Sequence, residues 1–438
     1  MVRKAHRISL LDFLATMRRR DLLLTAFPAL LHAQEKARSN GPATIRAVEM
    51  IRVEGRRKIE AGDVKGQHQV NPLHVYAEHR PTEYRERTRP AGEARTTALY
   101  LRITTNEGPE GLYGPIDTEA AIVVYQQLRP FLIGKDALAG ETLWDKMYRS
   151  NRHSRSSHFM MGISAVDNAL WDLRGRYYST PVYRLLGGPT RKEVNVYGSC
   201  LGHSVEPERM RATAAEFKKQ GFRGQKWFMP AGPGDGPAGL QKNVEMVRIL
   251  RETVGADYDL MFDAFMGWDY NYAIQWAKQV EPFRPRWIEE PFHVDKMESF
   301  ANLRRATSIP VATGEHFYGR FEAMRYLQAG AISVVQADPE WCGGVSELMK
   351  ICHIASSLDA HVIPHGHNVH TALHVIAAQS PMTCPLLEYL ISKMSSYYFF
   401  EKWDPKPVNG VIILPETPGF GIELDEAKIE KRTVATWG

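Results

Sequence analysis

Short apolar runs alternate with longer amphipathic segments along the chain from residue 190 onward. The runs are rich in β-branched and aromatic residues, as buried parallel strands are, and the segments between them repeat apolar positions at helical spacing. The eight runs are residues 194–198, 224–229, 260–265, 286–291, 310–315, 333–339, 361–366 and 386–390. Helices between them are expected at residues 241–254, 272–280 and 345–358. Eight such units in about 200 residues predict a closed (β/α)8 barrel rather than an open doubly wound sheet.

The part of the chain before the barrel has a different pattern, which predicts an α+β module. Residues 45–53 and 98–104 have the composition of strands, and residues 111–114 follow a turn. Helical spacing occurs at residues 118–131 and 141–150. The polar stretch between the first two strands is too long for an ordinary hairpin loop, so we expect it to be functional or poorly ordered.

The first forty residues have the features of an export signal. Three consecutive arginines, Arg18 to Arg20, precede an apolar run at residues 22–31 that is too short to span a bilayer. Arginines directly before the apolar run favour twin-arginine export. We therefore expect residues 1–40 to be a signal peptide and linker, and the mature protein to be periplasmic or secreted. The alternative is an irregular extension or a misassigned start codon, with the protein then cytoplasmic.

The composition is that of an ordinary globular protein: 438 residues, 44% hydrophobic and 24% charged, with a formal charge of +5. Lysines and arginines are spread along the chain, so no nucleic-acid partner is expected. The four cysteines, Cys200, Cys342, Cys352 and Cys384, lack CxxC spacing and fit neither a zinc site nor a disulfide framework. We expect them to be small buried apolar residues.

Three carboxylates lie at matching places in successive β-α units. Asp263, Glu289 and Glu315 are each 26 residues from the next, near the C-terminal ends of their predicted strands. Barrels place their chemistry at that end. Three carboxylates gathered there would repel one another unless a cation neutralised them. Oxygen ligands without His or Cys favour magnesium or manganese over zinc, so we expect one divalent ion, Mg2+ before the others.

The sequence also places a candidate general base near the predicted metal site. His365 is at the end of the seventh predicted strand, and Asp338, at the end of the sixth, can bind its other ring nitrogen. A substrate carboxylate on the metal would be polarised, so that His365 could remove the adjacent proton and leave an enediolate. His367, two residues further on, is the alternative base. His365 is preferred because it lies nearer the strand end.

Several segments resemble the enolase superfamily in its mandelate racemase branch, and the resemblance extends over nearly everything from residue 43 onward. Three of them resemble that family's metal-ligand segments: FDA at 262–264, WIEEP at 287–291 and TGEH at 313–316. Two others resemble its entry into the barrel: ALWDLRGR at 169–176 and PVYRLLGG at 181–188. The resemblance implies the same three metal ligands and the same His-Asp pair, with Glu290 behind the ligands.

The resemblance also implies a domain organisation. Residues 41–165 would form an α+β capping domain that covers the barrel mouth and supplies specificity loops. Residues 166–400 would form the (β/α)8 barrel. Residues 401–438 would return to the capping domain.

Two positions where relatives carry a further base hold phenylalanine. The Lys-X-Lys pair of many relatives is Lys226-Trp227-Phe228 here, and Phe265 lies two residues after the third-strand ligand. Phenylalanine cannot accept a proton, so a two-base racemase is disfavoured. A single histidine can instead take the α-proton and then protonate the departing β-hydroxyl on the same face, which is a dehydration.

Within this branch the chain is most similar in pattern to the rhamnonate dehydratases. Four segments carry the similarity: QADPEWCGG at 336–344, IPHG at 363–366, PVNG at 407–410 and PGFGIEL at 418–424. The chain departs from that group after its PHG, where two serines are usual and His367 and Asn368 stand here.

The resemblance implies further site residues. Glu388 would hydrogen-bond the substrate carboxylate. Arg89, in the polar stretch, would bind the distal part of a sugar acid, unless it is a solvated arginine. His316 lies beside a ligand and could touch the substrate. Lys226 could either touch the substrate or form a salt bridge to a ligand.

Together these features predict a hydro-lyase that uses Mg2+ to dehydrate a sugar acid, an aldonate or a rhamnonate-like acid, to a 2-keto-3-deoxy acid. A sugar-acid epimerase or racemase of the same superfamily is the second hypothesis, and a metal-dependent binder of sugar acids without turnover is the third. We also expect a small-molecule substrate as the partner, no membrane association after export, and a homo-oligomer.

Overall fold

The computed structural model describes residues 43–60, 62–63, 69–80, 88–106 and 108–437. The predicted export signal, residues 1–40, lies outside the described residues and stays a prediction. Of the helices in the described ranges, none combines the length and the apolar composition that crossing a membrane requires.

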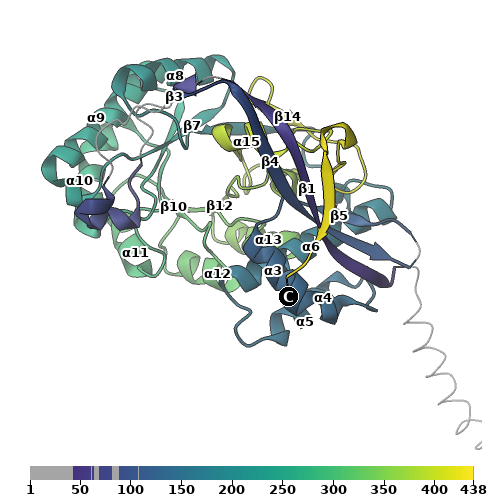
Figure 1. The fold of residues 1–438 in the computed structure, drawn as a ribbon. Helices are drawn as coiled ribbons and strands as arrows, with labels where there is room; N and C mark the ends of the chain where they lie inside the picture. The colour runs from purple at the N-terminus through teal and green to yellow at the C-terminus, as the bar shows by residue number, and fades with distance from the viewer. Residues whose placement is uncertain (1–42, 61, 64–68, 81–87, 107, 438) are drawn as a thin grey trace, which may run out of the picture.

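Eight parallel strands form a barrel, one for each predicted apolar run (Figure 1). They are β6 (Glu193–Ser199), β7 (Gly224–Phe228), β8 (Asp259–Asp263), β9 (Trp287–Glu289), β10 (Val311–Thr313), β11 (Val334–Val335), β12 (His361–Val362) and β13 (Leu387–Leu390). Their order is β12-β11-β10-β9-β8-β7-β6-β13. The Val362 amide at the end of β12 donates to the Thr383 carbonyl before β13 at 2.7 Å, which links the two ends of the sheet. The predicted (β/α)8 barrel is confirmed.

Helices between the strands cover the outside of the barrel (Figure 1). They are α8 (Pro207–Lys219), α9 (Gly236–Val254), α10 (Tyr270–Val280), α11 (Met297–Ala306), α12 (Arg320–Gln328), α13 (Gly344–Ser356) and α14 (Val369–Ala378). A further helix, α15 (Ile391–Tyr397), follows β13 and contacts the N-terminal part of the chain. Short 3-10 helices are η4 (Pro233–Asp235), η5 (Glu281–Phe283) and η6 (Glu426–Lys428). The barrel interior is a separate buried cluster of Tyr197, Met261, Trp287, Ala312, Val334, Ile363 and Leu386. These side chains form an apolar floor beneath the polar groups at the strand ends.

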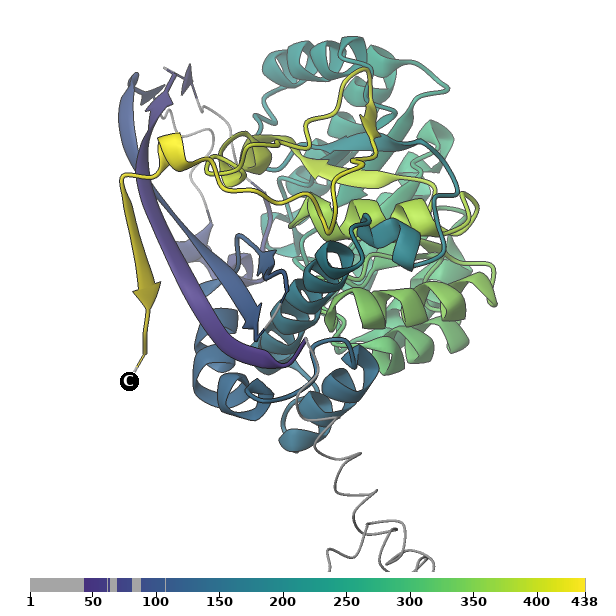
Figure 2. The ribbon, with the colours of Figure 1, turned by 90° about the vertical axis from the view of Figure 1, so that its right-hand side faces the viewer.

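A second, antiparallel sheet lies beside the barrel in the order β15-β1-β4-β5 (Figure 2). Its strands are β1 (Ile45–Ile59), β4 (Gly92–Thr105), β5 (Gly111–Tyr113) and β15 (Lys431–Ala435). A further strand, β14 (Val411–Ile413), pairs with β6 of the barrel. Because β15 pairs with β1, the end of the chain lies in the N-terminal sheet. β1 and β4 are longer than predicted, since polar residues 54–59 pair with residues 92–97 beyond the apolar part of the strands.

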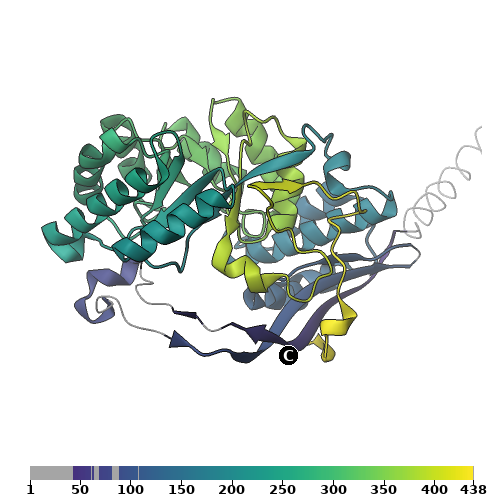
Figure 3. The ribbon, with the colours of Figure 1, turned by 90° about the horizontal axis from the view of Figure 1, so that it is seen from above.

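The polar stretch between β1 and β4 reaches across to the barrel (Figure 3). It contains β2 (Gly62–Asp63), which pairs with β3 (Thr88–Arg89), and the 3-10 helices η1 (Pro72–Val75) and η2 (Ala77–His79). The Val70 amide donates to the Met229 carbonyl, just after β7, at 2.8 Å. The described part of this stretch therefore packs on the C-terminal ends of the barrel strands, where the predicted site lies.

Helices join the two sheets. They are α3 (Thr118–Val123), α4 (Arg129–Leu132), α5 (Gly140–Ser150), α6 (Ser157–Tyr177) and α7 (Val182–Leu185). A π-helical stretch, η3 (Val124–Leu128), divides the single helix predicted for residues 118–131. The long helix α6 runs without a break through residue 165, where a domain boundary is expected, and packs on both α3 and α13. The expected boundary therefore falls inside a helix shared by both parts.

Asp172 on α6 connects three segments that are distant in the sequence. Its buried carboxylate accepts hydrogen bonds from the Leu112 amide in β5 at 2.8 Å and from the Phe420 amide at 2.9 Å. It also pairs with Arg176 Nε at 2.6 Å. One carboxylate therefore links the N-terminal sheet, α6 and the C-terminal segment.

Replacing Asp172 with alanine is expected to lower the free energy of unfolding by about 3–5 kcal/mol, because it leaves Arg176 and two backbone amides without their partner. Asp145→Ala is the matched control, since Asp145 and Arg149 form an ion pair with the same i, i+4 spacing on the surface of α5. That variant should cost less than about 1 kcal/mol. Denaturant unfolding of both variants measures the difference, and equal losses would contradict the role given to Asp172.

Candidate functional site

The three predicted metal ligands lie at the ends of neighbouring strands. Asp263 ends β8 and Glu289 ends β9, and the two residues are register partners across the sheet. Glu289 is also paired with Ala312 of β10, and Glu315 follows shortly after that strand. All three carboxylates are buried. Strand pairing therefore brings to the barrel mouth the three acids that the sequence spaces 26 residues apart.

A buried ammonium group lies among these acids. Lys226 Nζ in β7 contacts Glu289, and it is 3.3 Å from Asp263 Oδ2 and 2.8 Å from Glu388 Oε1. Lys226 is 1% exposed, and an ammonium at that depth requires opposite charges around it. The contacts of Lys226 show that Asp263, Glu289 and Glu388 converge on a position able to hold positive charge.

The Lys226 ammonium alone does not neutralise the negative charge of these carboxylates. Burial raises the pKa of Asp263 to about 6, that of Glu289 to about 8 and that of Glu315 to about 7. Lys226 opposes the rise in part for the first two, and His365 opposes it in part for Glu315. Carboxylates whose charge is penalised in this way are stabilised by a divalent cation, and oxygen donors suit Mg2+. The residues present therefore fit an ion held by Asp263, Glu289 and Glu315.

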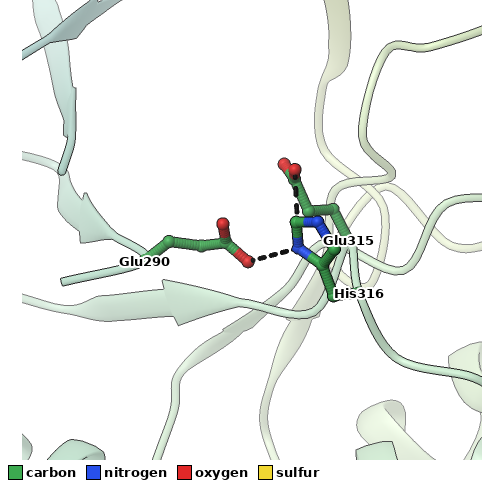
Figure 4. Close-up of side chains that lie close together, drawn as sticks. All are labelled: Glu290, Glu315 and His316. Carbon is green, nitrogen blue, oxygen red and sulfur yellow. Dashed lines mark hydrogen bonds and ion pairs between the residues drawn. The ribbon is translucent and has the colours of Figure 1, made fainter. Parts of the chain in front are cut away.

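Glu290, Glu315 and His316 form a second group that could hold a metal (Figure 4). His316 Nδ1 is 3.1 Å from Glu290 Oε1 and 3.6 Å from Glu315 Oε1. The left-handed backbone of Glu290, with φ at 41°, directs its carboxylate to His316 and to the Thr313 hydroxyl. Burial lowers the pKa of His316, but Glu290 and Glu315 raise it to about 9. Oxygen donors suit Mg2+ better than an imidazole nitrogen does, so the strand-end acids are the better magnesium site.

His365 faces Asp338 with one ring nitrogen and the ligand group with the other. Nδ1 is 2.7 Å from Asp338 Oδ2, and Nε2 is 3.6 Å from Glu315 Oε2. Burial lowers the pKa of His365, but Glu315 and Asp338 raise it to about 10. A cation bound to Glu315 would reduce the influence of Glu315 on His365 and so lower the pKa of His365. Nε2 would then be able to accept a proton. The structure thus brings together the two residues predicted to form the base and its partner.

His367, the alternative base, has both ring nitrogens directed at other groups. Lys393 Nζ donates to Nδ1 at 2.7 Å, and Nε2 is 3.1 Å from Glu340 Oε2 and 3.6 Å from Asp117 Oδ2. Asp117 stands at the N-cap position of α3 but its side chain caps no amide of that helix. Its carboxylate faces His367 instead, so His367 connects the barrel to the N-terminal part of the chain.

Two aromatic rings occupy the wall of the mouth across from His365. Phe228 ends β7 and Phe265 follows β8, and their ring centroids are 6.3 Å apart. The strand order places β8 four strands from β12, which is the far side of an eight-stranded barrel. The far wall therefore presents hydrocarbon, and no proton acceptor, at these two positions.

The remaining predicted site residues are placed as follows. Glu388, in β13, is buried, pairs with Lys226, and accepts a hydrogen bond from the Gly366 amide at 3.0 Å. Lys226 forms the salt bridge that the sequence left open, and a contact of either residue with substrate stays a prediction. Arg89 lies in β3, paired with Gly62, and its side chain is outside the described residues.

Trp341 is a residue of the site to which the sequence assigned no role. Its ring packs against those of His316, His365 and His367, with centroids 5.7, 5.1 and 5.1 Å away. Its indole N–H is buried and faces the Asp117 carboxylate. No local pattern predicts that one ring would touch three histidines from two loops.

The sequence also matches known protein families. The family model described as "Enolase C-terminal domain-like" matches residues 209–428, and that of the "Mandelate racemase / muconate lactonizing enzyme, N-terminal domain" matches residues 78–187. A curated relative, L-rhamnonate dehydratase of Saccharopolyspora erythraea, is 32% identical over 368 residues, which cover 82% of this chain and 90% of the relative.

Solved structures share the whole architecture. Rhamnonate dehydratase from Gibberella zeae complexed with Mg is similar with a TM-score of 0.74 at 28% identity, covering 89% of this chain and 96% of that one. A racemase from Streptomyces coelicolor with bound magnesium has a TM-score of 0.70 at 25% identity, covering 88% of this chain and 98% of that one. On these matches and on the site geometry, the chain belongs to the enolase superfamily, in its mandelate racemase / muconate lactonizing enzyme branch.

Proposed function

We propose that this protein is a carbon–oxygen lyase that removes water from a sugar acid, with Mg2+ as cofactor, and yields a 2-keto-3-deoxy acid. One observation carries the proposal, namely the one-sided arrangement of the mouth. His365 faces the predicted metal ligands, whereas Phe228 and Phe265 occupy the wall across from it. A single base on one face suits an elimination better than an inversion at the α-carbon.

The chemistry at the mouth follows from where His365 is held. Bound Mg2+ would polarise the substrate carboxylate and so acidify the proton on C2. Asp338 fixes His365 through Nδ1, so that Nε2 takes the C2 proton. The same nitrogen then gives a proton to the hydroxyl on C3, which leaves as water. The remaining enol takes up a solvent proton at C3 and becomes the 2-keto-3-deoxy acid.

Other side chains at the mouth would orient the substrate. Lys226 and Glu388, an ion pair with a 2.8 Å separation, adjoin Glu289 and would meet the substrate carboxylate. The Trp341 ring packs against His365 and would form an apolar wall beside the sugar chain. These contacts would place C2 and C3 of the substrate before His365 Nε2.

The relatives support a sugar acid as the substrate class. One is named L-rhamnonate dehydratase, and the structure complexed with Mg is a rhamnonate dehydratase. His367 and Asn368 stand where serines are usual in that group, and His367 contacts the N-terminal part of the chain through Asp117. We therefore propose that the substrate is an aldonate or a rhamnonate-like acid, which the screen described next would identify.

The test is a screen of the Mg2+-loaded protein against a library of sugar acids, with detection of 2-keto products. At least one acid is expected to give product, with activity lost in EDTA and restored by added Mg2+. Failure of every acid to turn over would overturn the proposal. Stabilisation by a sugar acid that needs metal, gives no product and persists in His365→Ala would instead identify a binding protein without turnover.

A further inference from the structure

A cavity of about 560 Å³ lies away from the catalytic residues, between the N-terminal sheet and α15. Residues of β1 and β4, the segment 115–118 and the end of α15 line it. Three of the lining side chains are arginines, namely Arg52, Arg57 and Arg95. The volume is within the range of small-molecule sites, and its charged lining is entirely basic.

Two of these arginines have no counter-charge among the described residues. Arg52 and Arg57 are partly buried, and no carboxylate of the described residues lies within ion-pairing distance of either. Arg52 Nε is fully buried and has no hydrogen-bond partner among the described residues. Burying a guanidinium nitrogen without a partner is costly, so this arrangement is expected in a site that receives an anion.

The Glu54 carboxylate on β1 pairs with only one of the three arginines. Glu54 is 3.7 Å from Arg95 and is shared with Lys431, also at 3.7 Å. Arg95 itself has a side chain that is 79% exposed, so it can turn into the cavity. Thr96 and Thr97 also line the cavity, and a threonine hydroxyl can donate to an oxygen atom of a ligand.

The cavity adjoins the catalytic mouth through two side chains. Asp117 lies between the lining residues Ile116 and Thr118, and its carboxylate is 3.6 Å from His367 Nε2. Tyr397 lines the cavity, and its ring packs edge-on against that of His367 at 5.8 Å. A ligand in the cavity would therefore be separated from His367 by a single layer of side chains.

From this geometry we propose that the cavity is a second binding site, for a small oxyanion that carries at least two negative charges as carboxylate or phosphate groups. Arginine recognises both groups through paired N–H donors, and two or three guanidinium groups around one cavity match a multiply charged ligand. The site is separate from the predicted metal centre and does not depend on the reaction proposed for it.

Isothermal titration of the Mg2+-loaded protein with inorganic phosphate and, separately, with succinate tests this proposal. At least one anion is expected to bind, and the tighter of the two identifies the preferred group. In Arg52→Gln/Arg57→Gln the affinity should fall at least tenfold. Arg56→Gln is the matched control, because Arg56 neighbours Arg57 on β1 but does not line the cavity and pairs with Glu430. It should bind as the wild type does.

Two results would overturn the proposal. One is that the wild type binds neither anion, and the other is that the double variant binds as tightly as the wild type, which would place the anion at the metal centre or elsewhere. If the double variant does not fold, Arg95→Gln replaces it, because that exposed side chain is not needed for folding. Its affinity should fall about threefold or more, and unchanged affinity would equally contradict the site.

Discussion

Replacing His365 with asparagine is expected to lower kcat for dehydration of the sugar acid by about 10⁴-fold. The reason is that one nitrogen, Nε2, removes the C2 proton and also protonates the departing hydroxyl, so the variant loses the base and the acid together. The fold and the affinity for Mg2+ should change little, since His365 is not one of the predicted ligands. Steady-state kinetics and a metal titration on the same preparation measure both quantities.

His367→Asn is the matched control for this variant. His367 lies two residues away and contacts the same Trp341 ring, but its nitrogens face Lys393, Glu340 and Asp117. Its loss disturbs the contact with the N-terminal part of the chain rather than proton transfer, so kcat/KM should fall by no more than about tenfold. If the two variants lost kcat equally, the assignment of His365 as the base would be wrong.

Replacing Glu289 with glutamine is expected to weaken Mg2+ binding by more than about 100-fold and to abolish turnover at ordinary metal concentrations. Glutamine keeps the shape of the side chain but removes one of the three negative charges at the predicted centre. Titration of the metal-free protein with Mg2+, followed by heat or by thermal stabilisation, measures the loss.

Glu290→Gln separates the two candidate metal groups. Glu290 lies next to Glu289 in the sequence but is directed to His316 and Thr313. The Glu290→Gln variant should therefore bind Mg2+ about tenfold more weakly, which is the usual effect of removing a residue that supports the metal ligands. A larger loss in Glu290→Gln than in Glu289→Gln would place the ion among Glu290, Glu315 and His316.

The barrel could be predicted from the sequence because each of its strands is a short apolar run buried on both faces. The strand ends then located Asp263 and Glu289, and their register pairing in the structure confirms that they are neighbours. The N-terminal sheet was predicted less well. Residues 54–59 and 92–97 pair in antiparallel fashion and are mostly polar, so no alternation of apolar and polar positions marks their strands.

The contacts that join distant segments could not be predicted. Asp117 has the sequence context of an ordinary helix cap, and Lys393 that of a surface lysine, yet both meet His367. The basic cavity likewise depends on the pairing of β1 with β4 and on the position of α15, which local patterns do not encode. The end of a strand can be located from the local sequence pattern. Contacts between the N-terminal sheet and the barrel depend on the whole fold.

In the proposed reaction one histidine, His365, acts on one face of the substrate. The most direct test is partial turnover of the active sugar acid in D2O with Mg2+, followed by NMR of both the product and the recovered starting acid. We expect a 2-keto product that carries one deuterium at C3, and no epimer of the starting acid. Accumulation of the C2 epimer with deuterium at C2 and its hydroxyl retained would contradict it, because that result requires proton delivery from the face that Phe228 and Phe265 occupy.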